Sequence, residues 1–149
     1  MPGTYARVLG LSCMEQDVLK GMRILVVEDE PLLAWELELA LADAGATVIG
    51  PARTLSIGCA LAQQEDLTAA VLDVRLGKED SAPIAAALYE QGVPFLFHTG
   101  HGSRFELGQQ WAAPVISKPS NPDAVVATVA NLVAPPARCG RDRDAVRSQ

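Results

Sequence analysis

The chain has 149 residues, of which 49% are hydrophobic and 20% are charged. This apolar content is enough for one folded core, which excludes a chain that is disordered throughout. Acidic residues outnumber basic ones by 18 to 12, giving a net charge of -6, so the sequence lacks the basic excess with which proteins bind nucleic acid.

The two ends of the chain lack the patterns seen between them. Residues 1–21 have no clear periodicity, and we predict a flexible N-terminal extension. Ala134-Pro135-Pro136 ends the last helical pattern, and the arginine-rich stretch after it predicts a disordered tail over 134–149. No apolar run approaches the ~20 residues needed to span a bilayer, and the N-terminus has no secretory pattern. We therefore expect a cytoplasmic protein, without membrane contact, folded over 22–133.

Five short apolar runs are candidates for β-strands. Each is almost continuously apolar rather than alternating, which is typical of strands that a parallel sheet buries on both faces. The runs are Arg23–Val27, Thr47–Ile49, Ala69–Leu72, Phe95–His98 and Val115–Ser117.

Helical patterns fill the gaps between these runs. We predict that Thr54, Ser81 and Asn121 are N-caps, and that Gly45 and Gly92 end helices. The predicted helices are Pro31–Ala44, Leu55–Gln64, Ala82–Gln91 and Pro122–Val133, with a short, weakly patterned one between Ser103 and Gln110. This alternation predicts an α/β fold with a doubly wound five-stranded parallel sheet, helices on both faces and a short or irregular fourth helix.

Polar residues follow four of the predicted strands, at the edge where such sheets bind ligands. They are Glu28-Asp29-Glu30, Asp73, Thr99-Gly100 and Lys118-Pro119. Converging carboxylates repel each other unless a cation lies among them, and oxygen ligands suit Mg²⁺ or Mn²⁺. A carboxylate surrounded by a cation, an ammonium group and a hydroxyl predicts a site where that carboxylate accepts a phosphoryl group.

These motifs resemble the receiver domain of two-component response regulators. The segments Ile24-Leu25-Val26-Val27-Glu28-Asp29-Glu30-Pro31, Val71-Leu72-Asp73-Val74, Thr99-Gly100 and Lys118-Pro119 carry the resemblance, in the order and at the strand ends that this family has. It covers about Arg23 to Val133 and implies a flavodoxin-like fold.

The resemblance also implies a role for each site residue. Asp73 would be phosphorylated by a histidine kinase or a phosphotransfer protein. Asp29 and Asp73 would bind Mg²⁺ directly together with the main-chain carbonyl of Arg75, and Glu28 would complete the acidic pair, often through water. Thr99 would be the switch hydroxyl, and Lys118 would pair with the phosphate.

A narrower likeness is to the FATGUY receivers, which are often single-domain proteins associated with kinases of the HWE or related families. Pro94-Phe95-Leu96-Phe97-His98-Thr99-Gly100 and Leu72-Asp73-Val74-Arg75-Leu76-Gly77 carry it. His98 stands where that motif usually has Ala. Val115 stands where many receivers have an aromatic switch residue, and the interval from Thr99 to Lys118 is a few residues short.

Three functions are open to such a chain. The first is a single-domain response regulator that signals, or relays phosphate, through contacts with a downstream protein that the sequence does not identify, without being a turnover enzyme. The second is a phosphate-independent interaction module on the same fold. The third is a phosphatase of the haloacid-dehalogenase type, which the order of the motifs disfavours because that family has its nucleophile after the first strand.

The remaining cysteine, histidine and tryptophan residues favour ordinary roles. Cys13, Cys59 and Cys139 have no metal-type spacing and predict reduced thiols. His98 and His101 lack a third ligand of a suitable type, which favours packing or loop positions over a metal site. We interpret the two tryptophans as packing or partner contacts.

Overall fold

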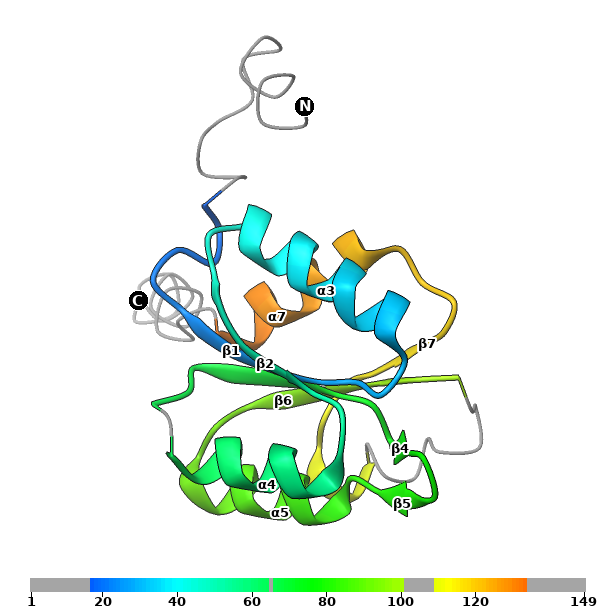
Figure 1. Ribbon diagram of the computed structural model, residues 1–149. Coiled ribbons are helices and arrows are strands. Elements are labelled where there is room, and N and C mark those ends of the chain that lie inside the picture. Colours follow the sequence, from blue (N-terminus) through cyan, green and yellow to red (C-terminus); the bar gives the residue numbers. More distant parts are fainter. Residues whose placement is uncertain (1–16, 65, 101–108, 134–149) are drawn as a thin grey trace, which may run out of the picture.

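A computed structural model of the protein describes residues 17–64, 66–100 and 109–133. Within these ranges a five-stranded sheet has the order β2-β1-β3-β6-β7, and its paired neighbours all run parallel (Figure 1). The strands are β1 (Arg23–Val27), β2 (Thr47–Ala52), β3 (Ala69–Leu72), β6 (Phe95–Thr99) and β7 (Val115–Ser117). The predicted parallel sheet is confirmed.

Helices cover both faces of this sheet, as predicted. Figure 1 shows α3 (Pro31–Asp43) and α7 (Pro122–Val133) on one face. It shows α4 (Leu55–Gln64) and α5 (Ala82–Gln91) on the other. The chain crosses from one face to the other as the strand order reverses at β1, which is the arrangement that creates a ligand site at the carboxyl ends of the strands.

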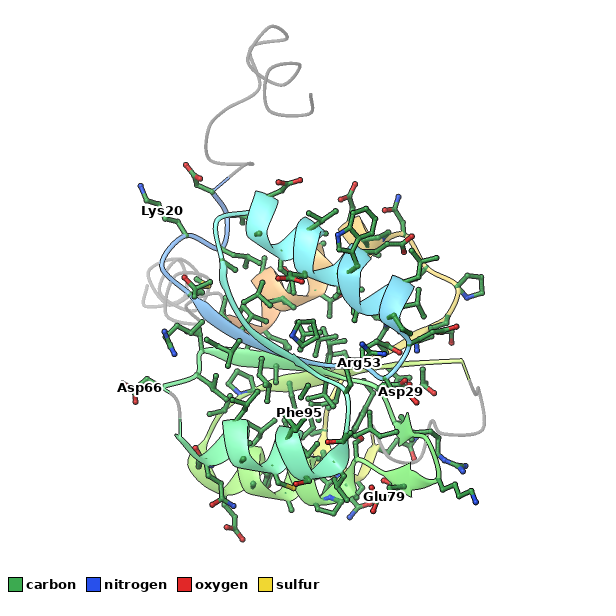
Figure 2. All side chains as sticks on the ribbon, viewed as in Figure 1. Lys20, Asp29, Arg53, Asp66, Glu79 and Phe95 are labelled. Atoms are coloured by element: carbon green, nitrogen blue, oxygen red, sulfur yellow. The ribbon has the colours of Figure 1, made fainter. Side chains whose placement is uncertain are left out.

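Successive residues of the central strands enter two different cores. In β1, Leu25 and Val27 pack with residues of α4 and α5, whereas Ile24 and Val26 pack with residues of α3 and α7. Figure 2 shows Phe95 in the first of these cores, between the sheet and its lower helices. Both faces of the sheet are therefore buried, which explains why the strands are almost continuously apolar.

Two of the predicted helix caps bond through their side chains, and the third holds the N-cap position without such a bond. Thr54 Oγ1 accepts the N–H of Ile57 at 3.2 Å, and Asn121 Oδ1 accepts the N–H of Asp123 at 2.9 Å. At the start of α5, Ser81 holds the N-cap position but makes no side-chain capping bond, while Asp80 Oδ1 accepts the N–H of Ala82 at 2.7 Å. The Ser81 side chain is buried, and its carbonyl accepts the N–H groups of Ile84 and Ala85.

A small antiparallel hairpin follows Asp73 and was not predicted. It pairs β4 (Arg75–Leu76) with β5 (Glu79–Asp80) around a turn in which Gly77 has a φ of 65°. Strands of two residues carry no hydrophobic periodicity that the sequence could reveal. The hairpin lies at the same edge of the sheet as the polar motifs (Figure 1).

The packed domain includes residues that precede the predicted boundary at residue 22. Leu19 is buried in the core beside α3 and α7, and its N–H donates to the carbonyl of Ala44 at 2.8 Å. Residues 1–16 and 134–149, on which most of the predicted extension and the tail fall, lie outside the described residues.

The predicted fourth helix falls mostly on residues 101–108, which also lie outside the described residues, and residues 109–111 are helical. In the described part of the chain, every helix is too short or too polar to cross a membrane.

Candidate functional site

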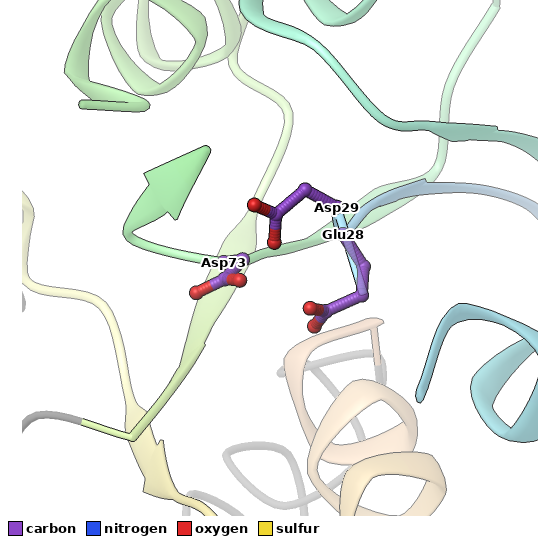
Figure 3. A group of neighbouring side chains, drawn as sticks. All are labelled: Glu28, Asp29 and Asp73. Atoms are coloured by element: carbon purple, nitrogen blue, oxygen red, sulfur yellow. The ribbon is translucent and has the colours of Figure 1, made fainter. Parts of the chain in front are cut away.

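Three carboxylates meet at the carboxyl ends of β1 and β3. These strands are hydrogen-bonded neighbours with Val27 opposite Leu72, so the residues that follow them are adjacent. One carboxylate oxygen from each of Glu28, Asp29 and Asp73 lies within 4.8 Å of the other two. Figure 3 shows the three side chains grouped together. The order of the sheet therefore brings Asp73 next to Glu28 and Asp29, which precede it by 45 and 44 positions in the sequence.

Lys118 reaches the same cluster from the end of β7. Its Nζ lies 3.0 Å from Glu28 Oε1 and 3.2 Å from Asp73 Oδ2, and it also donates to Glu28 Oε2 at 3.1 Å. The backbone N–H of Lys118 donates to the carbonyl of Thr99 at 2.7 Å. This bond fixes the backbone of Lys118 against the end of β6. One ammonium group thus bridges two of the three carboxylates.

In the described part of the chain, the negative charge of this cluster exceeds the positive charge that Lys118 supplies. Burial and the nearby charge of Asp73 raise the pKa of Glu28 to about 7, although the hydrogen bond from Lys118 opposes the shift. Burial would lower the pKa of Lys118, but the hydrogen bond to Glu28 and the charge of Asp73 outweigh it and raise that pKa. Three carboxylates facing one ammonium are the arrangement that a bound cation stabilises.

The hairpin after Asp73 forms one wall of the site. The N–H of Gly77 donates to Asp29 Oδ2 at 2.8 Å, and the N–H of Arg75 points at Asp73 Oδ1 over 3.4 Å. A cavity of about 260 Å³ opens here. Its lining residues are Asp29, Glu30, Asp73, Arg75, Gly77, Gly100 and Lys118. Gly77 was not predicted as a site residue, although it ends the segment Leu72–Gly77 that carries the likeness to the FATGUY receivers.

Thr99 occupies the last position of β6, between the strands that precede Asp73 and Lys118. It is buried, and its backbone pairs with Ser117 of β7. The structure thus places all the predicted site residues at one edge of the sheet, with Thr99 at the end of the strand that lies between those preceding Asp73 and Lys118.

The other residues considered from the sequence have ordinary surroundings where they are described. Trp111 packs against Tyr89 and Phe95, with ring centroids 5.3 and 6.3 Å apart. Trp35 is 57% exposed, so packing does not explain it. Cys59 is a free, partly buried thiol. His101, Cys13 and Cys139 lie outside the described residues.

The chain is similar to several known response-regulator proteins. The phyllosphere-induced regulator PhyR of Methylorubrum extorquens is 34% identical over 114 residues, which cover 74% of this chain and 43% of that protein. The crystal structure of the response regulator PhyR from Brucella abortus aligns with a TM-score of 0.70 and 24% identity, over 99% of this chain and 61% of that one. No protein-family model matches the sequence.

A third likeness is to a solved receiver domain. The non-phosphorylated HemR receiver domain of Leptospira biflexa aligns with a TM-score of 0.67 and 25% identity, over 76% of this chain and 95% of that one. These likenesses, together with the strand order, show that the described part of the chain has the fold of response-regulator receiver domains. The chain spans less than half the length of the Methylorubrum regulator.

Proposed function

We propose that this receiver domain accepts a phosphoryl group on Asp73 and signals through protein contacts. The observation that supports this most directly is the position of Lys118 Nζ, 3.2 Å from Asp73 Oδ2 and in contact with the buried Glu28. A lysine held beside a carboxylate can neutralise the oxygens of a phosphoryl group arriving on that carboxylate.

The proposed reaction is a transfer between two protein side chains. A carboxylate oxygen of Asp73 attacks the phosphorus of a phosphohistidine, the P–N bond breaks, and its electron pair returns to the imidazole of the donor. The product is an aspartyl phosphate, which water later hydrolyses slowly. Because the protein is modified and then reset, this activity is autocatalytic phosphotransfer and not enzymatic turnover of a substrate.

The donor atoms at the site fit Mg²⁺ or Mn²⁺. All of them are oxygens, which these hard ions prefer. Burial, and then the charge of Asp73, raise the pKa of Glu28, and a divalent ion would offset the repulsion between these two carboxylates. Asp29, Asp73 and the carbonyl of Arg75 would hold the ion. Glu28 would contact it through water. When bound, the ion supplies positive charge to the transferring phosphoryl oxygens.

An exposed apolar stripe on α3 offers a docking surface for the phosphate donor. Leu32, Trp35 and Leu39 are 61%, 57% and 45% exposed, and their spacing places them on one face of the helix. Leu32 lies in the first turn of α3, three residues beyond Asp29, so the stripe begins at the end of the helix that follows the site. We propose that this partner is a histidine kinase or phosphotransfer protein in the cytoplasm. Membership of the FATGUY group and pairing with an HWE-type kinase stay predictions.

Labelling with acetyl phosphate and Mg²⁺ tests the proposed acceptor. The wild type should take up a phosphoryl group that survives acid and is lost in base, and Asp73→Asn should take up none. Asp43→Asn, which changes an exposed aspartate at the end of α3, is the matched control and should label as the wild type does. Equal labelling of Asp73→Asn would place the acceptor elsewhere.

A second arm separates the chemistry from docking. Trp35→Ala should slow transfer from a phosphohistidine protein and leave labelling by acetyl phosphate unchanged, because only the protein donor uses the stripe. If neither acetyl phosphate nor a phosphohistidine protein labels the wild type, the result would instead favour a phosphate-independent interaction module. Repeated turnover of a phosphate monoester would favour a phosphatase.

A further inference from the structure

A buried histidine ties β6 to the loop that carries Lys118. His98 is 3% exposed, and its Nε2 lies 2.9 Å from Ser120 Oγ. Its neighbour Leu96, two positions earlier in β6, belongs to the core under α3 and α7, so the alternation of a strand places His98 on that same side. Ser120 is two residues beyond Lys118 and immediately precedes Asn121, which caps α7.

The direction of this hydrogen bond follows from the surroundings of the imidazole. Burial, and then the charge of Lys118, lower the pKa of His98 to about 4, so the ring is neutral near pH 7 and carries one proton. Nδ1 is buried and has no hydrogen-bond partner among the described residues. An unpaired buried N–H is costly, so the proton belongs on Nε2, where it can be donated to Ser120.

The loop from Lys118 to Asn121 is fixed at three points. At its start, the N–H of Lys118 donates to the carbonyl of Thr99. At its end, Asn121 caps α7 through its side chain and its carbonyl. Between them, the bond from His98 to Ser120 is a side-chain tie to the sheet. His98 directly precedes Thr99 in the chain. The end of β6 therefore carries both the predicted switch hydroxyl and the imidazole that bonds to the loop of Lys118.

We propose that His98 is a positioning residue which, through Ser120, holds Lys118 in place to receive the phosphoryl group. The proposal rests on the proposed function of Asp73, because the lysine matters only if a phosphoryl group arrives there. His98 touches none of the reacting atoms. Its effect is to restrict the backbone from which the ammonium group of Lys118 extends. The lysine then loses less conformational entropy when the phosphoryl group is bound.

The test compares the rates at which acetyl phosphate labels a set of variants. His98→Leu and Ser120→Ala should each slow labelling by about three- to tenfold, the effect of losing one neutral hydrogen bond. The double variant should be no slower than the slower single variant, because both changes remove the same tie. In a Lys118→Ala background, neither change should slow labelling further.

Rescue and folding controls separate positioning from general damage. Ser120→Thr keeps the hydroxyl and should label at nearly the wild-type rate. If His98→Leu unfolds, Ser120→Ala still tests the tie, because Ser120 lies in a loop and is only partly buried. Additive effects in the double variant, or an unchanged slowing in Lys118→Ala, would overturn the proposal.

A spectroscopic measurement makes the result independent of phosphorylation. The ¹⁵N spectrum of the imidazoles should show His98 as the neutral form protonated on Nε2, and Ser120→Ala should shift that signal. Protonation on Nδ1 instead would overturn the tie itself. A wild type that takes no label while the spectrum shows the tie would overturn the role in phosphoryl transfer, and with it the proposed function.

Discussion

The backbone N–H of Gly77 donates a hydrogen bond to Asp29 Oδ2 over 2.8 Å, which joins the turn of the β4–β5 hairpin to the end of β1. Asp29 is one of the three carboxylates whose oxygens lie within 4.8 Å of one another. The bond therefore fixes the orientation of an acidic side chain that would otherwise turn away from its negatively charged neighbours.

Magnesium should stabilise the fold through this carboxylate cluster. At a concentration ten times the Kd, binding to the folded state alone contributes about 1.4 kcal/mol to the free energy of unfolding. The melting temperature should rise with Mg²⁺ in the wild type and much less in Asp29→Asn. Glu90→Gln, an exposed change on α5, is the control and should respond as the wild type does. Equal rises in all three proteins would argue against this site.

Leu19 should contribute to stability as a core residue does, although it precedes the predicted domain boundary. Its side chain is fully buried, whereas Leu32 is 61% exposed. Leu19→Ala should lower the free energy of unfolding by about 3 kcal/mol, and Leu32→Ala by less than about 0.5 kcal/mol. Urea unfolding of the two variants measures both values. A small effect of Leu19→Ala would show that the folded unit begins after it.

His98 and Glu28 should make opposite contributions to the pH dependence of stability. Folding lowers the pKa of His98 from 6.5 to about 4, so between these values the unfolded chain binds more protons, and stability falls as the pH falls. Folding raises the pKa of Glu28 from 4.5 to about 7, so between these values the folded state binds more protons, and stability rises as the pH falls.

Two variants separate these contributions. Compared with the wild type, His98→Leu should become more stable on going from pH 7 to pH 5, because only the Glu28 contribution remains. Glu28→Gln should become less stable over the same interval. Urea midpoints measured in EDTA, which removes metal ions from the cluster, give the comparison. Slopes identical to that of the wild type in both variants would contradict the assigned pKa shifts.

The regular part of the fold could be predicted because burial and capping leave clear marks in the sequence. The continuous apolar runs reflect a sheet covered on both faces, and Asn121 marks the start of α7 by a bond that its residue type favours. The β4–β5 hairpin left no such mark, since its strands are two residues long. Ser81 holds the predicted N-cap position of α5, but the side-chain bond to the first turn of the helix comes from Asp80.

The candidate site was predictable in its residue types and not in its contacts. The rule that ligands bind at the carboxyl ends of parallel strands was enough to group Asp73 with Lys118. The hydrogen bond from Gly77 to Asp29 and the tie between His98 and Ser120 depend on how loops pack, which a single sequence does not encode in any periodic pattern.

The residue that carries the phosphoryl group decides the central claim. After labelling with acetyl phosphate and Mg²⁺, borohydride reduces an aspartyl phosphate to homoserine, and peptide mass spectrometry then locates the changed residue. We predict homoserine at position 73 in the wild type, and none in protein that was not labelled. Labelled protein with an unchanged Asp73, or with the modification at another carboxylate such as Asp29, would contradict the account.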